Sequence, residues 1–283
     1  MSLFLSREEL WDRPLGGISR ERELPHWSGN ILFILVAAIC KLCFRYRVEG
    51  KANLAPFARR KGVVVVCNHT SYLDTVFVYL AARPKQWVRL MGRESLFEAG
   101  HGFVGQLLSR VGAFPVKRDS ADLSAVKRAS RMLKNGEAVG IFPEGTRRGK
   151  GSQSPEIHAG AAFVARMAKA PILPMTVRNA ELVKQKGRFI RFPKITVEYG
   201  LPVLVGDFDF LPKEERLEAC SWYCMRECFA LSARIAPEQV DMAALFPGAK
   251  DYTEAFRQHP VPSHSSQAVC QGTAWDDAHE ASQ

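Results

Sequence analysis

The sequence predicts an α/β fold, with a mainly parallel central sheet that is flanked by helices and preceded by an N-terminal membrane-associating helical element. From Gly62 onward, short β-branched runs alternate with helical segments, which is typical of parallel sheets covered on both faces. The long apolar run Ile31–Cys40 comes before that pattern. The 283 residues are 47% hydrophobic and 24% charged, which indicates a globular protein and excludes a disordered chain, a collagen-like repeat and a multi-span membrane protein.

The N-terminal part combines a polar segment with an apolar helix. Prolines and glycines within residues 1–28 prevent a long helix there. The following helix, Ile31–Phe44, reaches only about 21 Å, which is short of the roughly 30 Å hydrocarbon core of a bilayer. Because Trp27 and basic residues flank it, an interfacial helix over residues 29–44 fits better than a single span or a core helix.

The remaining elements follow from the hydrophobic pattern. The predicted strands are Val63–Cys67, Trp87–Met91, Ala113–Lys117, Val139–Phe142, Ile172–Val177 and Ile195–Tyr199. The predicted helices are Leu73–Ala82, Phe103–Arg110, Asp122–Lys134, 159–169 and 213–235. The last helix carries three cysteines on one face, which are expected to pack in the core: Cys220, Cys224 and Cys228.

Three regions result from this assignment. Residues 1–48 form the membrane-associating segment and residues 49–257 form the α/β domain. Residues 258–283 are rich in Ser, Gln, Ala and His and are expected to form a disordered tail. Seven cysteines and a charged N-terminus without a secretory signal indicate a reducing, cytoplasmic setting.

The net charge of +10 is unevenly distributed. It amounts to +5 over residues 1–62, +12 over residues 63–200 and −7 over residues 201–283. The positive middle segment indicates an anionic partner. Composition leaves four classes open, which are a phosphate metabolite, an anionic membrane, an acidic carrier protein and a nucleic acid.

The first polar cluster, Asn68–Asp74, directly follows a predicted strand. His69 precedes Asp74 by five residues, and the carboxylate could orient one tautomer of the imidazole so that the other nitrogen accepts a proton. Ser71 and Asp74 also have the spacing of a capping box for the next helix. Both interpretations can hold together, because the cap would fix Asp74 where His69 needs it.

The second polar cluster, Phe142–Lys150, directly follows another predicted strand and contains three cations. Its glycine allows the backbone to approach a ligand, and the cations favour an oxyanion. Its spacing is not that of a P-loop, so the alternative is an exposed basic loop. A third segment, Gly112–Arg118, is a predicted strand that ends in a basic pair.

In this order and spacing, the three clusters resemble the glycerophospholipid acyltransferase superfamily, and most of all the lysophosphatidic acid acyltransferases. The likeness covers roughly residues 50–204. Its blocks match Asn68, His69, Ser71 and Asp74, then Gly112 and Arg118, then the complete motif Phe142–Arg147, and then Ala170–Met175.

The resemblance implies an enzyme that transfers an acyl group from acyl-CoA or acyl-carrier protein to lysophosphatidic acid, giving phosphatidic acid. His69 would be the general base and Asp74 would orient it. Arg118, Glu144, Gly145, Thr146 and Arg147 would bind the acceptor, with the arginines on its phosphate. No metal or cofactor is expected beyond the acyl donor. The resemblance also implies that residues 29–44 hold the enzyme peripherally or monotopically on the cytoplasmic face of the membrane.

Two positions depart from the family pattern. Arg148 stands where a small hydroxyl residue is common, and His158 stands where many relatives have Lys. Both changes flank the expected acceptor site, so glycerol 3-phosphate or another lysolipid stays open as the acceptor. A non-catalytic anionic-lipid-binding protein would not need a base beside a carboxylate. A nucleic-acid-binding protein would place aromatic residues among the cations, and residues 146–154 have none.

Overall fold

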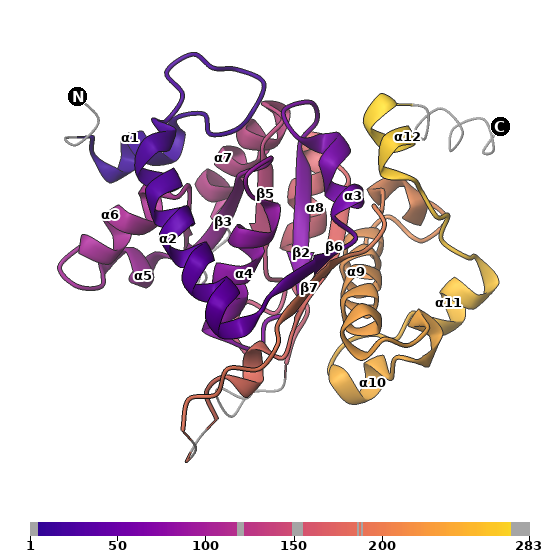
Figure 1. Ribbon diagram of the computed structural model, residues 1–283. Coiled ribbons are helices and arrows are strands. Elements are labelled where there is room, and N and C mark those ends of the chain that lie inside the picture. Colours follow the sequence, from indigo (N-terminus) through magenta and orange to yellow (C-terminus); the bar gives the residue numbers. More distant parts are fainter. Residues whose placement is uncertain (1–4, 118–121, 149–154, 186, 188, 273–283) are drawn as a thin grey trace.

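The computed structural model describes residues 5–117, 122–148, 155–185, 187 and 189–272. Within these residues seven strands form one sheet, in the order β1-β7-β6-β2-β5-β3-β4 (Figure 1). The strands are β1 Arg47–Glu49, β2 Val63–Cys67, β3 Val88–Arg93, β4 Phe114–Val116, β5 Ala138–Ile141, β6 Ile172–Arg178 and β7 Thr196–Tyr199. Neighbours run parallel except β6 and β7, which confirms the mainly parallel sheet.

The predicted helices are present, with shorter elements between them. The α-helices are α1 Arg7–Asp12, α2 His26–Phe44, α3 Lys51–Leu54, α4 Tyr72–Ala82, α5 Glu94–Glu98, α6 Phe103–Arg110, α7 Leu123–Lys134, α8 Gly160–Ala168, α9 Arg216–Ala233, α10 Met242–Leu245, α11 Thr253–Gln258 and α12 Ser266–Gln271. The 3₁₀ turns are η2 Ala55–Phe57, η3 Ala180–Leu182, η4 Val205–Phe208 and η5 Pro237–Gln239.

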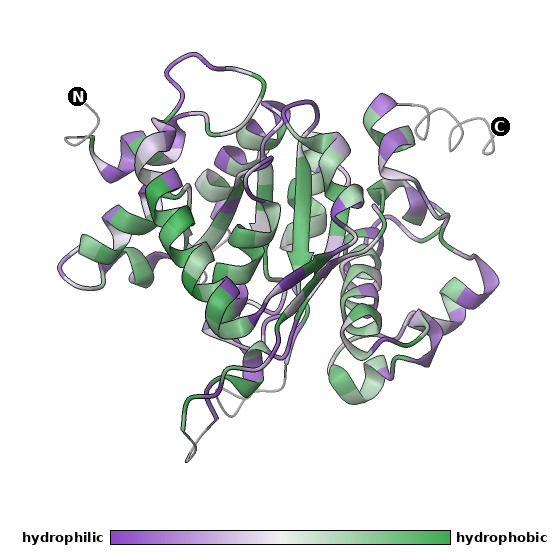
Figure 2. Cartoon of the chain, viewed as in Figure 1, coloured by the Kyte–Doolittle hydropathy of each residue, from purple (hydrophilic) through white to green (hydrophobic). Residues whose placement is uncertain are grey.

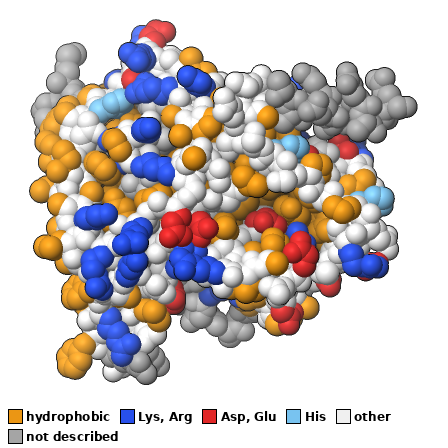
Figure 3. Space-filling model, turned by 45° about the vertical axis from the view of Figure 1, so that its right-hand side comes forward, with side chains coloured by type: hydrophobic (Ala, Val, Ile, Leu, Met, Phe, Trp, Pro, Cys, Tyr) orange, Lys and Arg blue, Asp and Glu red, His pale blue; other side chains and the backbone are white. Residues whose placement is uncertain are grey.

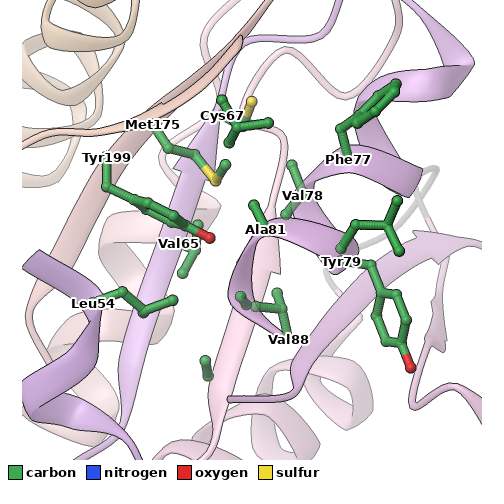
Figure 4. Close-up of a cluster of buried hydrophobic side chains, with 14 of the residues drawn as sticks. Leu54, Val65, Cys67, Phe77, Val78, Tyr79, Ala81, Val88, Met175 and Tyr199 are labelled. Atoms are coloured by element: carbon green, nitrogen blue, oxygen red, sulfur yellow. The ribbon is translucent and has the colours of Figure 1, made fainter. Parts of the chain in front are cut away.

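Strand β2 is at the centre of the sheet, and both of its faces are buried. Val65 and Cys67 point toward α4, where they pack with Phe77 and Val78 (Figure 4). Val64 and Val66 belong to the second core, which α7, α8 and α9 cover from the opposite face. The continuous apolar run of this strand therefore fits a sheet with helices on both sides.

Helix α2 is apolar on most of its surface (Figure 2). Cys40 and Phe44 are buried against the sheet. Its outer face exposes a stripe of large side chains, namely Trp27, Ile31, Ile34, Leu35, Ile39 and Leu42. Within the described part of the chain, no helix has both the length and the hydropathy that a bilayer crossing requires.

The C-terminal segment corrects one expectation, because part of the tail that we predicted to be disordered is a helix. Helix α12 packs against α3 and η2 and buries Val269 completely in the core. The Lys61 Nζ donates a hydrogen bond to the Val269 carbonyl, at 2.6 Å. The polar composition of this segment predicted disorder, and a helix of six residues is too short to show a hydrophobic periodicity that would predict it. Residues 273–283 of that tail lie outside the described residues.

Candidate active site

The two polar clusters meet at the carboxyl edge of the sheet. Strands β2 and β5 are parallel neighbours, so the turns that follow them lie side by side. The His69 backbone N–H donates to Glu144 Oε1 at 2.8 Å. In return, the Arg148 backbone N–H donates to the His69 carbonyl at 2.9 Å. These reciprocal bonds hold the histidine turn and the Phe142–Arg147 motif in fixed positions.

His69 and Asp74 form a pair. The His69 Nδ1 lies 3.1 Å from Asp74 Oδ2, and the Asp74 side chain is buried. The same carboxylate oxygen accepts backbone N–H bonds from Thr70 at 2.6 Å and Ser71 at 2.7 Å. Because an ionised carboxylate only accepts hydrogen bonds, His69 carries its proton on Nδ1, and Nε2 is left to accept another.

The capping box that the sequence predicted is present at the start of α4. The Ser71 Oγ accepts a bond from the Leu73 N–H at 3.3 Å, while Asp74 accepts the Ser71 N–H. The helix cap therefore fixes the position of the Asp74 carboxylate relative to the imidazole of His69. The ring of Phe142 lies 4.3 Å from the ring of His69, between centroids, and supports it from the neighbouring turn.

Glu144 has a different environment from the one that we expected. It is buried, and its Oε2 lies 2.6 Å from Arg148 Nε. Burial raises the pKa of the Glu144 carboxyl, although the His69 N–H and the Arg148 guanidinium act in the opposite direction. Both carboxylate oxygens thus have partners in the protein. Glu144 therefore holds the His69 backbone through Oε1, and its contact with an acceptor hydroxyl stays a prediction.

Arg148 departs from the family pattern, and its surroundings differ from the acceptor site that we expected beside it. Its guanidinium instead lies over the rings of Phe229 and Phe246, at 4.6 Å and 4.3 Å. It also donates to the Leu245 carbonyl at 3.3 Å. Residues 144–148 form a turn and not a helix, so their spacing alone gave no signal of this ion pair.

The remaining motif residues lie at the surface of the same edge. Gly145 adopts φ +62°, a conformation that favours glycine. Thr146 is exposed. The Arg147 guanidinium lies 3.2 Å from the centroid of the exposed Tyr72 ring. A side chain at position 145 would meet the ring of His158 at 3.2 Å, so the structure places His158 directly against this loop.

Two further residues complete the comparison with the sequence. Asn68, the first residue of the histidine turn, is buried and accepts a bond from the Thr176 hydroxyl of β6 at 2.9 Å. This bond ties the turn to the next strand. Arg118, which the resemblance assigned to the acceptor phosphate, lies outside the described residues.

An apolar cavity of about 240 Å³ adjoins the first turn of α4, the helix that carries Asp74. It is enclosed by α2, α4, β3, α5 and α6, and Thr75 on its wall directly follows Asp74. Other lining residues are Phe33, Val36, Val76, Leu90, Leu107 and Ala113. The cavity is therefore suited to a hydrocarbon group and not to a charged one.

No metal site accompanies these groups in the part of the chain that the structure describes. Within it, no three His, Cys, Asp or Glu side chains are grouped so that they could hold a metal ion. Cys40 and Cys43 have the spacing of a metal-binding pair, but they lie on the apolar helix α2 as free cysteines.

Known proteins share both the sequence blocks and the fold. A family model described as Acyltransferase matches residues 45–178. A 1-acyl-sn-glycerol-3-phosphate acyltransferase of Bacillus subtilis is 33% identical over 173 residues, which cover 61% of this chain and 81% of the relative. The enzyme of the same name from Streptococcus pneumoniae is 29% identical over 145 residues, or 51% of each chain.

One solved structure has a similar fold. It is a 1-acyl-sn-glycerophosphate acyltransferase from Thermotoga maritima, with a TM-score of 0.52 and 22% sequence identity. The likeness covers 73% of this chain and 82% of that one. This likeness supports the fold, with its mixed sheet and covering helices. The assignment to a family depends on the relatives found by sequence.

Proposed function

The chain belongs to the glycerophospholipid acyltransferase family and is an O-acyltransferase, and we propose that it transfers an acyl group from a thioester donor to lysophosphatidic acid, giving phosphatidic acid. The names of the relatives support this acceptor. The observation that carries the chemistry is the contact of 3.1 Å between His69 Nδ1 and the buried Asp74 carboxylate.

His69 is the proposed general base. Its Nε2 removes the proton from the free hydroxyl of the acceptor while the hydroxyl oxygen attacks the thioester carbonyl. The carbon–sulfur bond then breaks, and the thiol leaves with a proton from the imidazolium. Asp74 stabilises that imidazolium and holds its tautomer. Base catalysis of this kind contributes about 10²–10⁴-fold, and the positioning of the two substrates supplies more.

The acceptor phosphate is proposed to bind at the exposed side of the Phe142–Arg147 turn. Arg147 is held over the Tyr72 ring, and a guanidinium in a fixed plane is well suited to bidentate binding of phosphate. Gly145 lets the acceptor approach the loop closely, and the exposed Thr146 hydroxyl can donate a hydrogen bond to the same phosphate. Arg118 keeps its proposed place as a second phosphate ligand, on the strength of the family motif alone.

The apolar cavity is the proposed site of an acyl chain. Thr75, which follows Asp74 in the chain, lines this cavity. An acyl chain bound in the cavity would therefore place its thioester carbonyl close to the His69–Asp74 pair. The donor class remains either acyl-CoA or acyl-carrier protein, and both suit the basic middle segment of the chain.

Helix α2 is the proposed contact with the membrane from which the lysolipid comes. Its outer stripe consists of large apolar side chains, and Lys41, Arg45 and Arg47 follow at its C-terminal end. An apolar helix with cations at one end binds the interface of an anionic bilayer. We therefore propose a peripheral or monotopic enzyme on the cytoplasmic face, attached through residues 29–44.

The proposed reaction is tested by acyl transfer with four substrate combinations. Labelled acyl-CoA and acyl-carrier protein are each offered with lysophosphatidic acid and with glycerol 3-phosphate. We expect transfer to lysophosphatidic acid. Transfer to glycerol 3-phosphate alone, or to another lysolipid alone, would replace the acceptor in the proposal.

Replacement of the base is the matching mutational test. We expect His69→Ala to lower kcat by at least about 10²-fold, because no other group takes the proton. Far-UV circular dichroism should match that of the parent, since the buried Asp74 carboxylate keeps its bonds from the Thr70 and Ser71 N–H groups when the imidazole is absent. Activity of the variant within a few-fold of the parent would contradict the assignment of His69.

A further inference from the structure

A second exposed apolar segment lies far from α2 in the sequence. In the connection between β6 and β7, Phe189 is 96% exposed, Ile190 60% and Phe192 54%. Phe189 is thus almost completely uncovered, and more than half of the surface of Ile190 and of Phe192 is in contact with solvent. Such a cluster at the tip of a projecting connection marks a contact surface.

This segment lies beside the C-terminal end of α2. The Arg45 guanidinium donates to the Phe192 carbonyl at 3.2 Å. The rings of Phe44 and Phe192 are 5.5 Å apart, and the Ile195 N–H donates to the Phe44 carbonyl at 3.1 Å. The two apolar elements are therefore parts of one continuous surface.

That surface is on the same edge of the sheet as His69. Strands β2 and β6 are parallel neighbours, so their carboxyl ends point the same way. In Figure 1 the connection after β6 projects beyond the edge where β2 ends. Contact between this connection and a flat surface would thus bring the active-site edge close to that surface.

Cations surround the apolar tip. Arg191 and Lys194 are exposed on the segment, and Arg45 and Arg47 are exposed on the adjoining end of α2. Figure 3 shows Lys and Arg side chains gathered among hydrophobic ones on the lower left of the face in view. Apolar side chains ringed by cations complement the interface of a bilayer that contains anionic lipids.

We propose that Phe189–Phe192 is a second bilayer-contact segment, which inserts into an anionic lipid surface next to α2 and fixes the active-site edge at the headgroups. Attachment at two places sets the orientation of the enzyme, whereas one helix would let it rotate about its axis. The inference rests on the proposed function only in taking the acceptor to be a membrane lysolipid.

The test measures partition of the full chain onto vesicles of equal parts phosphatidylcholine and phosphatidylglycerol, without substrates. We expect Ile190→Asp to weaken partition about tenfold, because it replaces an inserted side chain with an anion near anionic headgroups. Ile190→Leu should behave as the parent does. The matched control is Ile18→Asp, since Ile18 is 57% exposed and bonds to Asn135 at the opposite edge of the sheet.

The outcomes separate this inference from the proposed reaction. Equal partition of the parent, Ile190→Asp and Ile18→Asp would overturn the second contact, whatever the activity. Loss of self-association by Ile190→Asp in sedimentation, with unchanged partition, would also overturn it in favour of a second copy of the chain. Acyl transfer to detergent-dispersed lysophosphatidic acid should be the same in Ile190→Asp and in the parent. If the parent shows no such transfer, the proposed reaction is contradicted and the second membrane contact is not affected.

Discussion

At the scale of single residues, Arg148 is the least expected member of the active site. It faces Glu144 on one side and two aromatic rings on the other. Glu144 in turn holds the His69 backbone. Arg148 is therefore a positioning residue, which acts on the base through a buried carboxylate.

The ion pair leads to a prediction about pH. Without Arg148, the pKa of Glu144 rises further, because burial is then opposed by fewer favourable contacts. A protonated Glu144 holds the His69 N–H more weakly. We expect Arg148→Met to lower kcat/KM about ten- to a hundredfold at neutral pH and to move the acidic limb of the pH profile to higher pH.

The control for this prediction keeps the charge. Arg148→Lys should retain most of the activity and a nearly parental pH profile. A loss in Arg148→Met that is the same at every pH would show that Arg148 acts by packing alone.

The residues near the base differ in how far the sequence could predict them. His69 and Asp74 are five residues apart on one turn, so their contact follows from local geometry. Glu144 and Arg148 are also close in sequence, but their pairing depends on the burial of Glu144, which a motif does not reveal. Contact between Arg147 and Tyr72 required two turns from different strands to meet, and no local pattern encodes that.

At the scale of elements, α4 joins two parts of the site. Its first turn fixes Asp74, and its next residues, Thr75 and Val76, line the apolar cavity. A helix that is capped at one end and packed on the sheet keeps the cavity and the base at a fixed separation. The length of hydrocarbon that the cavity accepts should therefore decide which donors react.

This relation predicts the effect of filling the cavity. Ala113 lines its wall and is almost fully buried. We expect Ala113→Phe to lower the ratio of long-chain to short-chain transfer about tenfold or more, measured by competition between acyl donors. Overpacking should cost about 1–3 kcal/mol of stability. Ala113→Ser, which preserves the volume, should leave the chain preference unchanged, and an equal shift in both variants would contradict the assignment.

At the scale of the whole molecule, a buried arginine ties the N-terminal segment to the sheet. Arg89 of β3 is 3.0 Å from the buried Glu137 and donates to the carbonyls of Trp11, Arg13 and Gly112. Burial lowers the pKa of Arg89 and raises that of Glu137, although each partner opposes the shift of the other.

Removal of this arginine should destabilise the fold. We expect Arg89→Met to lower the free energy of unfolding by about 3–5 kcal/mol at neutral pH, because Glu137 is left as an unpaired buried charge. The pKa of Glu137 then lies further above its unfolded value, so the folded state holds its proton more tightly. The loss of unfolding free energy in Arg89→Met should therefore become smaller as the pH falls through the raised pKa of Glu137. Urea unfolding at several pH values measures it.

The double variant provides the matched comparison. Arg89→Met with Glu137→Met removes both charges and should recover part of the loss. A deficit that is independent of pH in the single variant would show that the lost backbone bonds outweigh the unpaired carboxylate.

The fold class was predictable because parallel strands and amphipathic helices have local periodicity. The core strand β2 and helix α6 were located correctly for that reason. Strand β1 and helix α12 were not, because each is short and depends on a distant partner. Val48 pairs with Val197, and Val269 enters a core built from residues far earlier in the chain.

The pairing of β1 with β7 has a consequence for biosynthesis. More than half of the chain separates Glu49 from its partner Glu198, so β1 has no neighbouring strand until β7 has left the ribosome. At roughly 5–20 residues per second this takes on the order of ten seconds. During that interval Phe77 of α4 can already cover Phe44, but the outer apolar stripe of α2 stays exposed. Early contact of this stripe with a lipid surface would therefore protect the incomplete domain from aggregation.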